Sequence, residues 1–167
     1  MQGCVYNGKI KLKKSALGGL AAVMLLATTS ISTAEVTAHN ANDLLQAVQD
    51  AGFVATMGTD SDGDPRISSR VSDTKFLIYF YGCENNKDCK SILIKAGYDL
   101  DTGITASKVN EWNRNKRFGK AYIDDDGDPY LEMDVNMDFD GLGDKNFADT
   151  LDWWRVTVEK FEEFIGW

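Results

Sequence analysis

The fold is decided by the stretch from Asn110 to Met137, which reads NEWNRNKRFGKAYIDDDGDPYLEMDVNM. Its first part has helical spacing: Trp112 lies on one face with Val109, Thr105 is placed to cap the helix, and Gly119 is placed to end it. The rest alternates apolar and polar residues around an Asp-Gly turn, the pattern of a β-hairpin. Four residues of the second arm are expected to face inward: Leu131, Met133, Val135 and Met137. The stretch therefore predicts a helix followed by a tight antiparallel return.

A second face of the predicted helix carries polar side chains at positions i, i+3, i+4 and i+7: Asn110, Asn113, Arg114 and Arg117. In one interpretation the amides bond backbone at a sheet edge while the cations, with Lys120, neutralise the acidic hairpin. In the other, the four residues line a groove for a carboxylate or a peptide terminus. Both interpretations stay open, and the four residues are candidates for a binding surface.

Before this stretch the pattern predicts one helix and then strands. Residues 40–52 have an apolar stripe of helical spacing, with Asn40 or Asn42 as cap and Gly52 at the end. Residues 53–58 and 66–71 alternate like half-buried strands and are joined by an Asp-Gly turn. Residues 75–82 are apolar on both faces, which predicts a central strand covered on both sides. A further strand is expected within Ser91–Leu100.

The last element is predicted to be a helix of about five turns. Its main apolar stripe repeats at intervals of four and three residues: Phe147, Leu151, Trp154, Val158, Phe161 and Ile165. A second stripe adds Trp153, Phe164 and Trp167. A small domain hides one such stripe more easily than two. The second stripe therefore either packs on the sheet or forms a dimer or partner surface.

The N-terminus predicts export. Residues 1–34 combine four lysines, an apolar run from Ala16 to Ser32 and a small-x-small end, as in a cleaved secretory signal peptide. An uncleaved membrane anchor is the alternative, although the run is short and diluted by Gly, Ser and Thr. We therefore expect a bacterial periplasmic or secreted protein of one domain, residues 35–167, without stable membrane insertion after cleavage.

Charge narrows the range of partners. Residues 1–34 hold four of the 18 basic side chains and none of the 26 acidic ones, which leaves 14 against 26 and a net charge of −12. Nucleic acids and anionic lipid surfaces are bound by clustered Lys and Arg. The composition therefore argues against both as partners.

The exported part contains two cysteines, Cys83 and Cys89. In an oxidising compartment a disulfide is the default, and closing so short a loop is worth about 2 kcal/mol. Zinc sites and redox dithiols usually hold their cysteines two residues apart and, for zinc, add further ligands. The spacing therefore favours a structural bridge.

Catalytic signals are weak. The one histidine, His39, follows the signal peptide directly, and a Ser–His–Asp or Cys–His site needs its histidine held against a nucleophile. The acidic turns at Asp60–Pro65 and Asp124–Pro129 do not match a helix–loop–helix calcium loop. We therefore expect no enzyme, no catalytic residues, no metal site and no cofactor. A small-ligand or calcium sensor that uses these turns is the alternative function.

The combination of KFLIYFYGC, the Asn110–Met137 stretch and a long terminal helix containing Trp resembles the YbjN family, whose members are described as bacterial sensory transduction regulators. The resemblance covers roughly residues 40–165. It implies a fold similar to type III secretion chaperones, an α+β sandwich of order α-β-β-β-(β)-α-β-β-α with helices packed on an antiparallel sheet. Such chaperones dimerise and hold extended peptides. The resemblance therefore implies a protein- or peptide-binding domain with a regulatory or chaperone-like role in the cell envelope, and a homodimer.

Overall fold

The computed structural model describes residues 35–167. The predicted signal peptide lies outside the described residues. The three helices are α1 (Ala41–Asp50), α2 (Ala106–Asn115) and α3 (Asp144–Ile165). The strands are β1 (Glu35–Val36), β2 (Thr56–Thr59), β3 (Pro65–Val71), β4 (Thr74–Tyr81), β5 (Ser91–Gly97), β6 (Lys120–Ile123), β7 (Pro129–Asn136) and β8 (Leu142–Gly143). Within residues 35–167, no helix is both long and apolar enough to cross a membrane.

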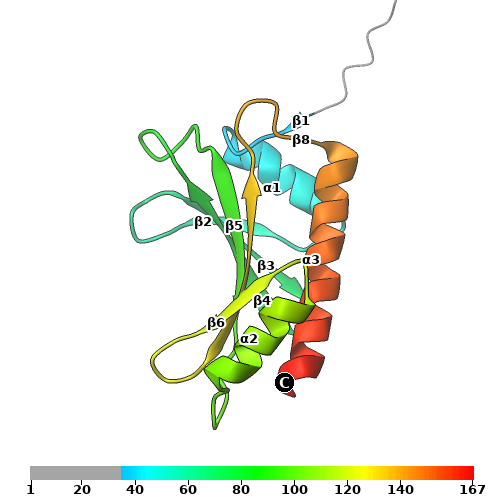
Figure 1. The fold of residues 1–167 in the computed structure, drawn as a ribbon. Helices are drawn as coiled ribbons and strands as arrows, with labels where there is room; N and C mark the ends of the chain where they lie inside the picture. The colour runs from blue at the N-terminus through cyan, green and yellow to red at the C-terminus, as the bar shows by residue number, and fades with distance from the viewer. Residues whose placement is uncertain (1–34) are drawn as a thin grey trace, which may run out of the picture. The chain divides into compact units, whose positions relative to one another are not determined.

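Six strands form one antiparallel sheet in the order β2-β3-β4-β5-β7-β6 (Figure 1). The short strands β1 and β8 pair separately. The predicted α+β class with helices packed on an antiparallel sheet is confirmed, and β5 is the further strand expected within Ser91–Leu100.

Helix α1 is built as its sequence predicts. The side chain of Asn40 accepts a hydrogen bond from the Asn42 amide and so caps the helix. Gly52 adopts a left-handed backbone with φ of 93°, and the next amide, that of Phe53, donates to the Val48 carbonyl. This end reverses the chain and starts it toward β2.

All three helices lie on one face of the sheet (Figure 1). The apolar stripe of α3 is buried against that face: Phe147, Leu151, Trp154, Val158, Phe161 and Ile165. Phe76 of β4 meets Trp154 at a ring distance of 5.9 Å, and Trp112 of α2 meets Phe161 at 4.9 Å. The core is therefore a single layer of side chains between sheet and helices.

The prediction that β4 is covered on both sides is wrong. Phe76, Ile78 and Phe80 are buried, but Leu77 and Tyr79 on the other face are half-exposed. The outward apolar residues on β4 belong to a sheet face that no described helix covers.

The centre of that open face is organised by Lys95 of β5. Its ammonium bonds the Tyr122 hydroxyl, lies 3.2 Å from a Glu132 carboxylate oxygen, and lies over the ring of Tyr130. Burial alone would lower the pKa of Lys95, but the hydrogen bonds with Tyr122 and Glu132 outweigh it and raise the pKa above its ordinary value. Lys95 therefore stays charged and ties β5 to β7 and β6.

Candidate functional site

The predicted disulfide is present: Cys83 and Cys89 are bonded with an S–S distance of 2.05 Å and close the loop between β4 and β5. Cys89 is fully buried. The bridge pins this loop at the end of the sheet, away from helix α2.

Asn113 supports the sheet edge. Its side-chain amide donates to the Ala121 carbonyl and its side-chain oxygen accepts from the Ala121 amide, each at 2.9 Å. Both hydrogen-bonding ends of the side chain are thereby used by strand β6. Of the two interpretations of Asn113, its hydrogen bonds fit the one in which the amide bonds backbone at a sheet edge.

The predicted helix is one turn shorter than expected, because α2 ends at Asn115 instead of running to Gly119. The Trp112 indole N–H donates to the Gly119 carbonyl at 3.1 Å, and this contact needs residues 116–119 to leave the helix and fold back. Arg117 therefore does not share a helix face with Asn110 and Arg114, although all three side chains are exposed.

The expected pairing of these cations with the acidic hairpin is also wrong. Within residues 35–167, Arg114, Arg117 and Lys120 form no salt bridge. The Arg117 guanidinium lies 5.4 Å from the ring centre of Phe118, and Lys120 donates to the Asn113 carbonyl. Two acids of the hairpin instead bond backbone amides: the Asp124 carboxylate accepts from the amides at 126 and 128, and the Asp128 carboxylate accepts from the Leu100 amide.

The second aromatic stripe of α3 is split among three places. Phe164 packs on Trp112, and Trp167, 56% exposed, meets Tyr98 edge-on. Trp153 is 42% exposed and stacks on Phe118 at a ring distance of 4.8 Å. The stripe therefore does not form one continuous apolar face.

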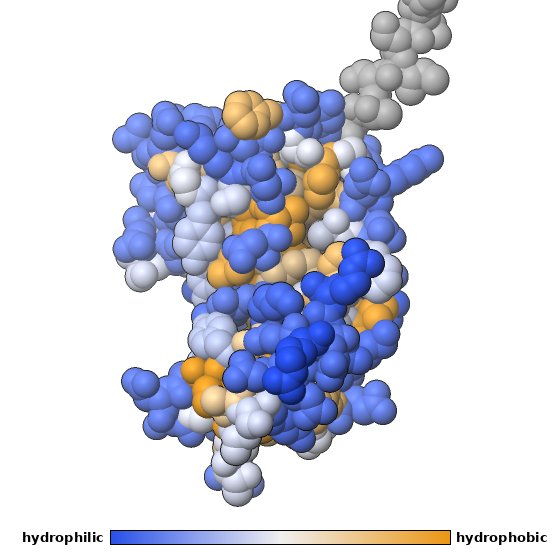
Figure 2. Space-filling view, in the orientation of Figure 1, coloured by the Kyte–Doolittle hydropathy of each residue, from blue (hydrophilic) through white to orange (hydrophobic). Residues whose placement is uncertain are grey.

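The stacked pair of Phe118 and Trp153 stands between two hollows. On one side is a basic cleft of about 210 Å³, whose lining includes Lys116, Arg117 and Lys160. On the other is a groove of about 510 Å³ between β7 and α3, which we call the β7–α3 groove. Figure 2 shows hydrophobic surface in a hollow between these two elements.

The β7–α3 groove has an apolar floor and a polar rim. Besides the aromatic pair, its apolar lining consists of Met133, Val135 and Leu142. Its polar lining consists of Asp134, Asn136, Asn146, Asp149 and Thr150. The residues that line the groove include two acids, Asp149 on α3 and Asp134 with its side chain toward the open sheet face, and no Lys or Arg, so the electrostatic preference of this edge is for a cation.

Sequence reasoning found Trp153 and Arg117 but missed the groove between β7 and α3. One signal was present: only four residues separate Gly119 from the acidic turn, whereas the second arm of the hairpin has eight. The mismatch means that half of β7 has no partner in β6. Met133 and Val135, expected to be core, are consequently half-exposed.

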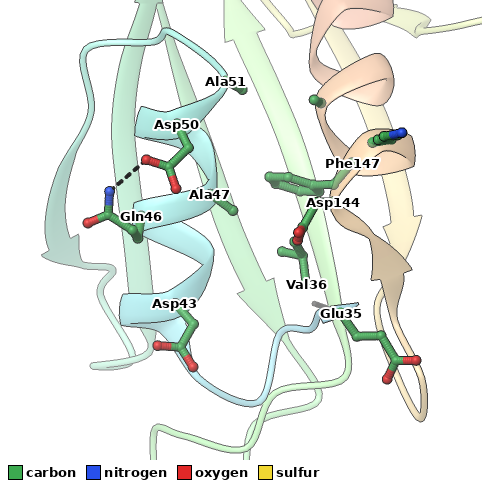
Figure 3. A pocket seen from close by; sticks show the side chains of 11 residues that line it. Glu35, Val36, Asp43, Gln46, Ala47, Asp50, Ala51, Asp144 and Phe147 are labelled. Carbon is green, nitrogen blue, oxygen red and sulfur yellow. Dashed lines mark hydrogen bonds between the residues drawn. The ribbon is translucent and has the colours of Figure 1, made fainter. Parts of the chain in front are cut away.

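A third hollow, of about 570 Å³, lies between α1 and the start of α3 (Figure 3). Val36, Ala47 and Phe147 are at its floor, and four carboxylates surround it: Glu35, Asp43, Asp50 and Asp144. Within residues 35–167, no group of three or more His, Cys, Asp and Glu side chains is arranged to hold a metal ion. This hollow offers negative charge but no preformed set of ligands.

His39 lies beside a carboxylate, with its Nε2 atom 3.7 Å from Asp138. The imidazole is exposed at the surface and is part of no hydrogen bond among the described residues. The geometry gives it no place in a catalytic triad.

A comparison with family models gives a match that covers most of the chain. The model of the YbjN family, described as "Putative bacterial sensory transduction regulator", matches residues 40–167. Neither the curated proteins nor the solved structures compared with the chain give a significant match. The matched segment runs from the cap of α1 to the last residue and includes every element that forms the β7–α3 groove. The chain therefore belongs to the YbjN family.

Proposed function

We propose that this protein is an exported, non-enzymatic domain that binds a segment of another protein in the bacterial cell envelope, with a regulatory or chaperone-like role. The observation that carries the proposal is the exposed stack of Phe118 and Trp153 at the mouth of the β7–α3 groove. Exposed aromatic side chains held on rigid elements are the usual anchors of protein interfaces. The family description as a regulator supports the same direction.

The surroundings of the stack suit a peptide better than a small metabolite. The groove and the basic cleft meet at the same aromatic pair, so one bound segment can contact both. Lys116 and Arg117 lie over aromatic rings in the basic cleft, where their charges can meet a carboxylate side chain or terminus of the partner. A peptide supplies both apolar groups and charges of either sign along one chain.

The proposal is tested with immobilised peptides of varied sequence and the purified protein. Peptides that bind are then titrated against variants. Trp153→Ala is expected to weaken binding at least about tenfold, as for an interface anchor. Trp167→Ala is the control, because Trp167 is a second exposed tryptophan just beyond the C-terminal end of α3 and does not line the groove, and it is expected to leave affinity unchanged. Equal affinities of both variants and the unaltered protein, or a library without binders, would refute the proposal.

The proposed function also includes export to the cell envelope and a homodimer. Export is checked by fractionating cells that express the full chain and sequencing the N-terminus of the exported form. A new N-terminus at Glu35 or His39 is the expected result, because cleavage after Ala34, or after Ala38 at the end of the VTA sequence, would produce one of these two residues.

A further inference from the structure

Half of strand β7 has an unpaired backbone edge. Residues 129–132 pair with β6 on one side and with β5 on the other, whereas residues 133–136 pair only with β5. A sheet edge of this kind is a template for a further strand.

The hydrogen-bond pattern shows which groups are free. Backbone bonds join Tyr98 to Pro129 and Met137 to Lys90, so the odd-numbered residues of β7 direct their N–H and C=O groups toward β5. In an antiparallel strand the next residue points the opposite way. Asp134 and Asn136 therefore direct their backbone N–H and C=O groups away from β5, and these groups bond no other described residue.

The edge stays open because the chain is turned away just before β6. Gly119 has a φ of 68°, and a Cβ atom there would lie 2.6 Å from the Thr157 methyl group. The preceding residue, Phe118, is thereby carried to α3, where it stacks on Trp153 instead of lying against β7. The free edge and the β7–α3 groove are two results of the same turn.

From this geometry we infer that a cationic, extended peptide adds to the sheet as a strand along residues 133–136 of β7. The inference rests on the proposed function and specifies its ligand. Side chains of a strand alternate between the two faces. One set enters the groove over Met133 and Val135 and is apolar; the other set lies on the open face near Asp134 and carries Lys or Arg.

Charge decides between a foreign peptide and a second copy of this chain. The rim carries Asp134 and Asp149 without a neighbouring cation in the groove. Pairing two copies through this edge would bring Asp134 of one close to Asp134 of the other, and like charges opposed across strands are destabilising. A basic peptide instead gains attraction at Asp134, on the face where its Lys or Arg side chains lie.

The test uses an acetylated, amidated peptide of alternating Lys and Val and two derivatives that carry N-methyl groups on alternate residues. Only one alternate set of amides faces β7 in an added strand. One derivative is expected to bind at least about tenfold more weakly, through loss of backbone hydrogen bonds, and the other within twofold of the parent. Each derivative controls for the conformational effect of methylation in the other.

Charge is tested in the same assay. Asp134→Asn is expected to weaken binding of the parent peptide about two- to fivefold, as for an exposed ion pair. The Asp134 side chain is exposed, so the substitution removes no core contact. A peptide with Glu in place of Lys is expected not to bind.

Absence of parent-peptide binding, equal affinities of the two methylated derivatives, unchanged affinity of the Asp134→Asn variant, or binding of the Glu peptide would overturn strand addition. The proposed function fails separately. If library peptides still bind in a Trp153-dependent way, the groove binds protein segments by another mode.

Discussion

Asn113 joins helix α2 to the sheet through one side-chain amide. Its two hydrogen bonds satisfy the backbone N–H and C=O groups of Ala121 on the outer side of edge strand β6. From the sequence, the spacing of Asn110 and Asn113 gave both residues equal standing. Only Asn113 faces strand β6. Which helix residue faces the strand depends on how the helix packs on the sheet, and the spacing in the sequence does not specify that packing.

We predict that Asn113→Ala lowers the free energy of unfolding by about 1–3 kcal/mol, because it leaves two partly buried backbone groups without partners. Asn110→Ala is the matched control and should change stability by less than about 0.5 kcal/mol, since Asn110 is exposed. Urea denaturation followed by circular dichroism measures both. If Asn113→Ala unfolds at the same urea concentration and instead weakens peptide binding, the side chain belongs to the binding surface.

The elements were largely predictable because each carries its own period. The four-and-three repeat of α3 and the alternation in β3 specify which side chains are buried, whereas the alternation in β7 specifies only which side chains point toward the helices. The separate pairing of β1 with β8 was not predicted, because two-residue strands have no measurable period. The β7–α3 groove was also not predicted from the pattern of any single element. Its unpaired edge arises from the difference in length between β6 and β7.

Gly119 turns the chain between α2 and β6. We predict that Gly119→Ala destabilises the protein more than Gly52→Ala. Both glycines have positive φ, which costs an alanine about 1–2 kcal/mol. Only at Gly119 would the new methyl group also clash, with Thr157 and with Leu131 at 3.1 Å. Gly52 has no atom within 4 Å of the added carbon.

Thermal unfolding of the two variants separates strain from clash. Gly52→Ala should lower the melting temperature by a few degrees, and Gly119→Ala by roughly twice as much or more. Equal shifts would mean that the chain relaxes around position 119 without disturbing α3.

Residues 35–167 form two layers, the sheet and the helices that cover one of its faces. The uncovered sheet face is the part of the fold that the sequence pattern predicted wrongly. Outward apolar residues on β4 predicted a covering element, yet the three helices all lie on the other face (Figure 1). The charges around these apolar residues offer another explanation for them. The open face mixes Arg66, Lys95, Glu132 and Asp134 with half-exposed Leu77, Tyr79 and Leu93, so both signs of charge surround an apolar centre.

A surface that carries both signs of charge can pair with its own copy, because in a two-fold interface a cation that meets an anion does so twice. We therefore predict that the expected homodimer forms through the open sheet face, since the second aromatic stripe of α3 is split among three contacts. Size-exclusion chromatography with light scattering at tens of micromolar should give the mass of two chains.

Leu93→Lys should shift the measured mass to that of one chain, because the lysine places an uncompensated charge at the centre of the interface. Lys95 already lies on the same strand and face, so the substitution is tolerated by the fold. Trp153→Ala, which alters the groove and the basic cleft on the helix side of the sheet, should remain dimeric, and a monomeric unaltered protein would remove the dimer altogether.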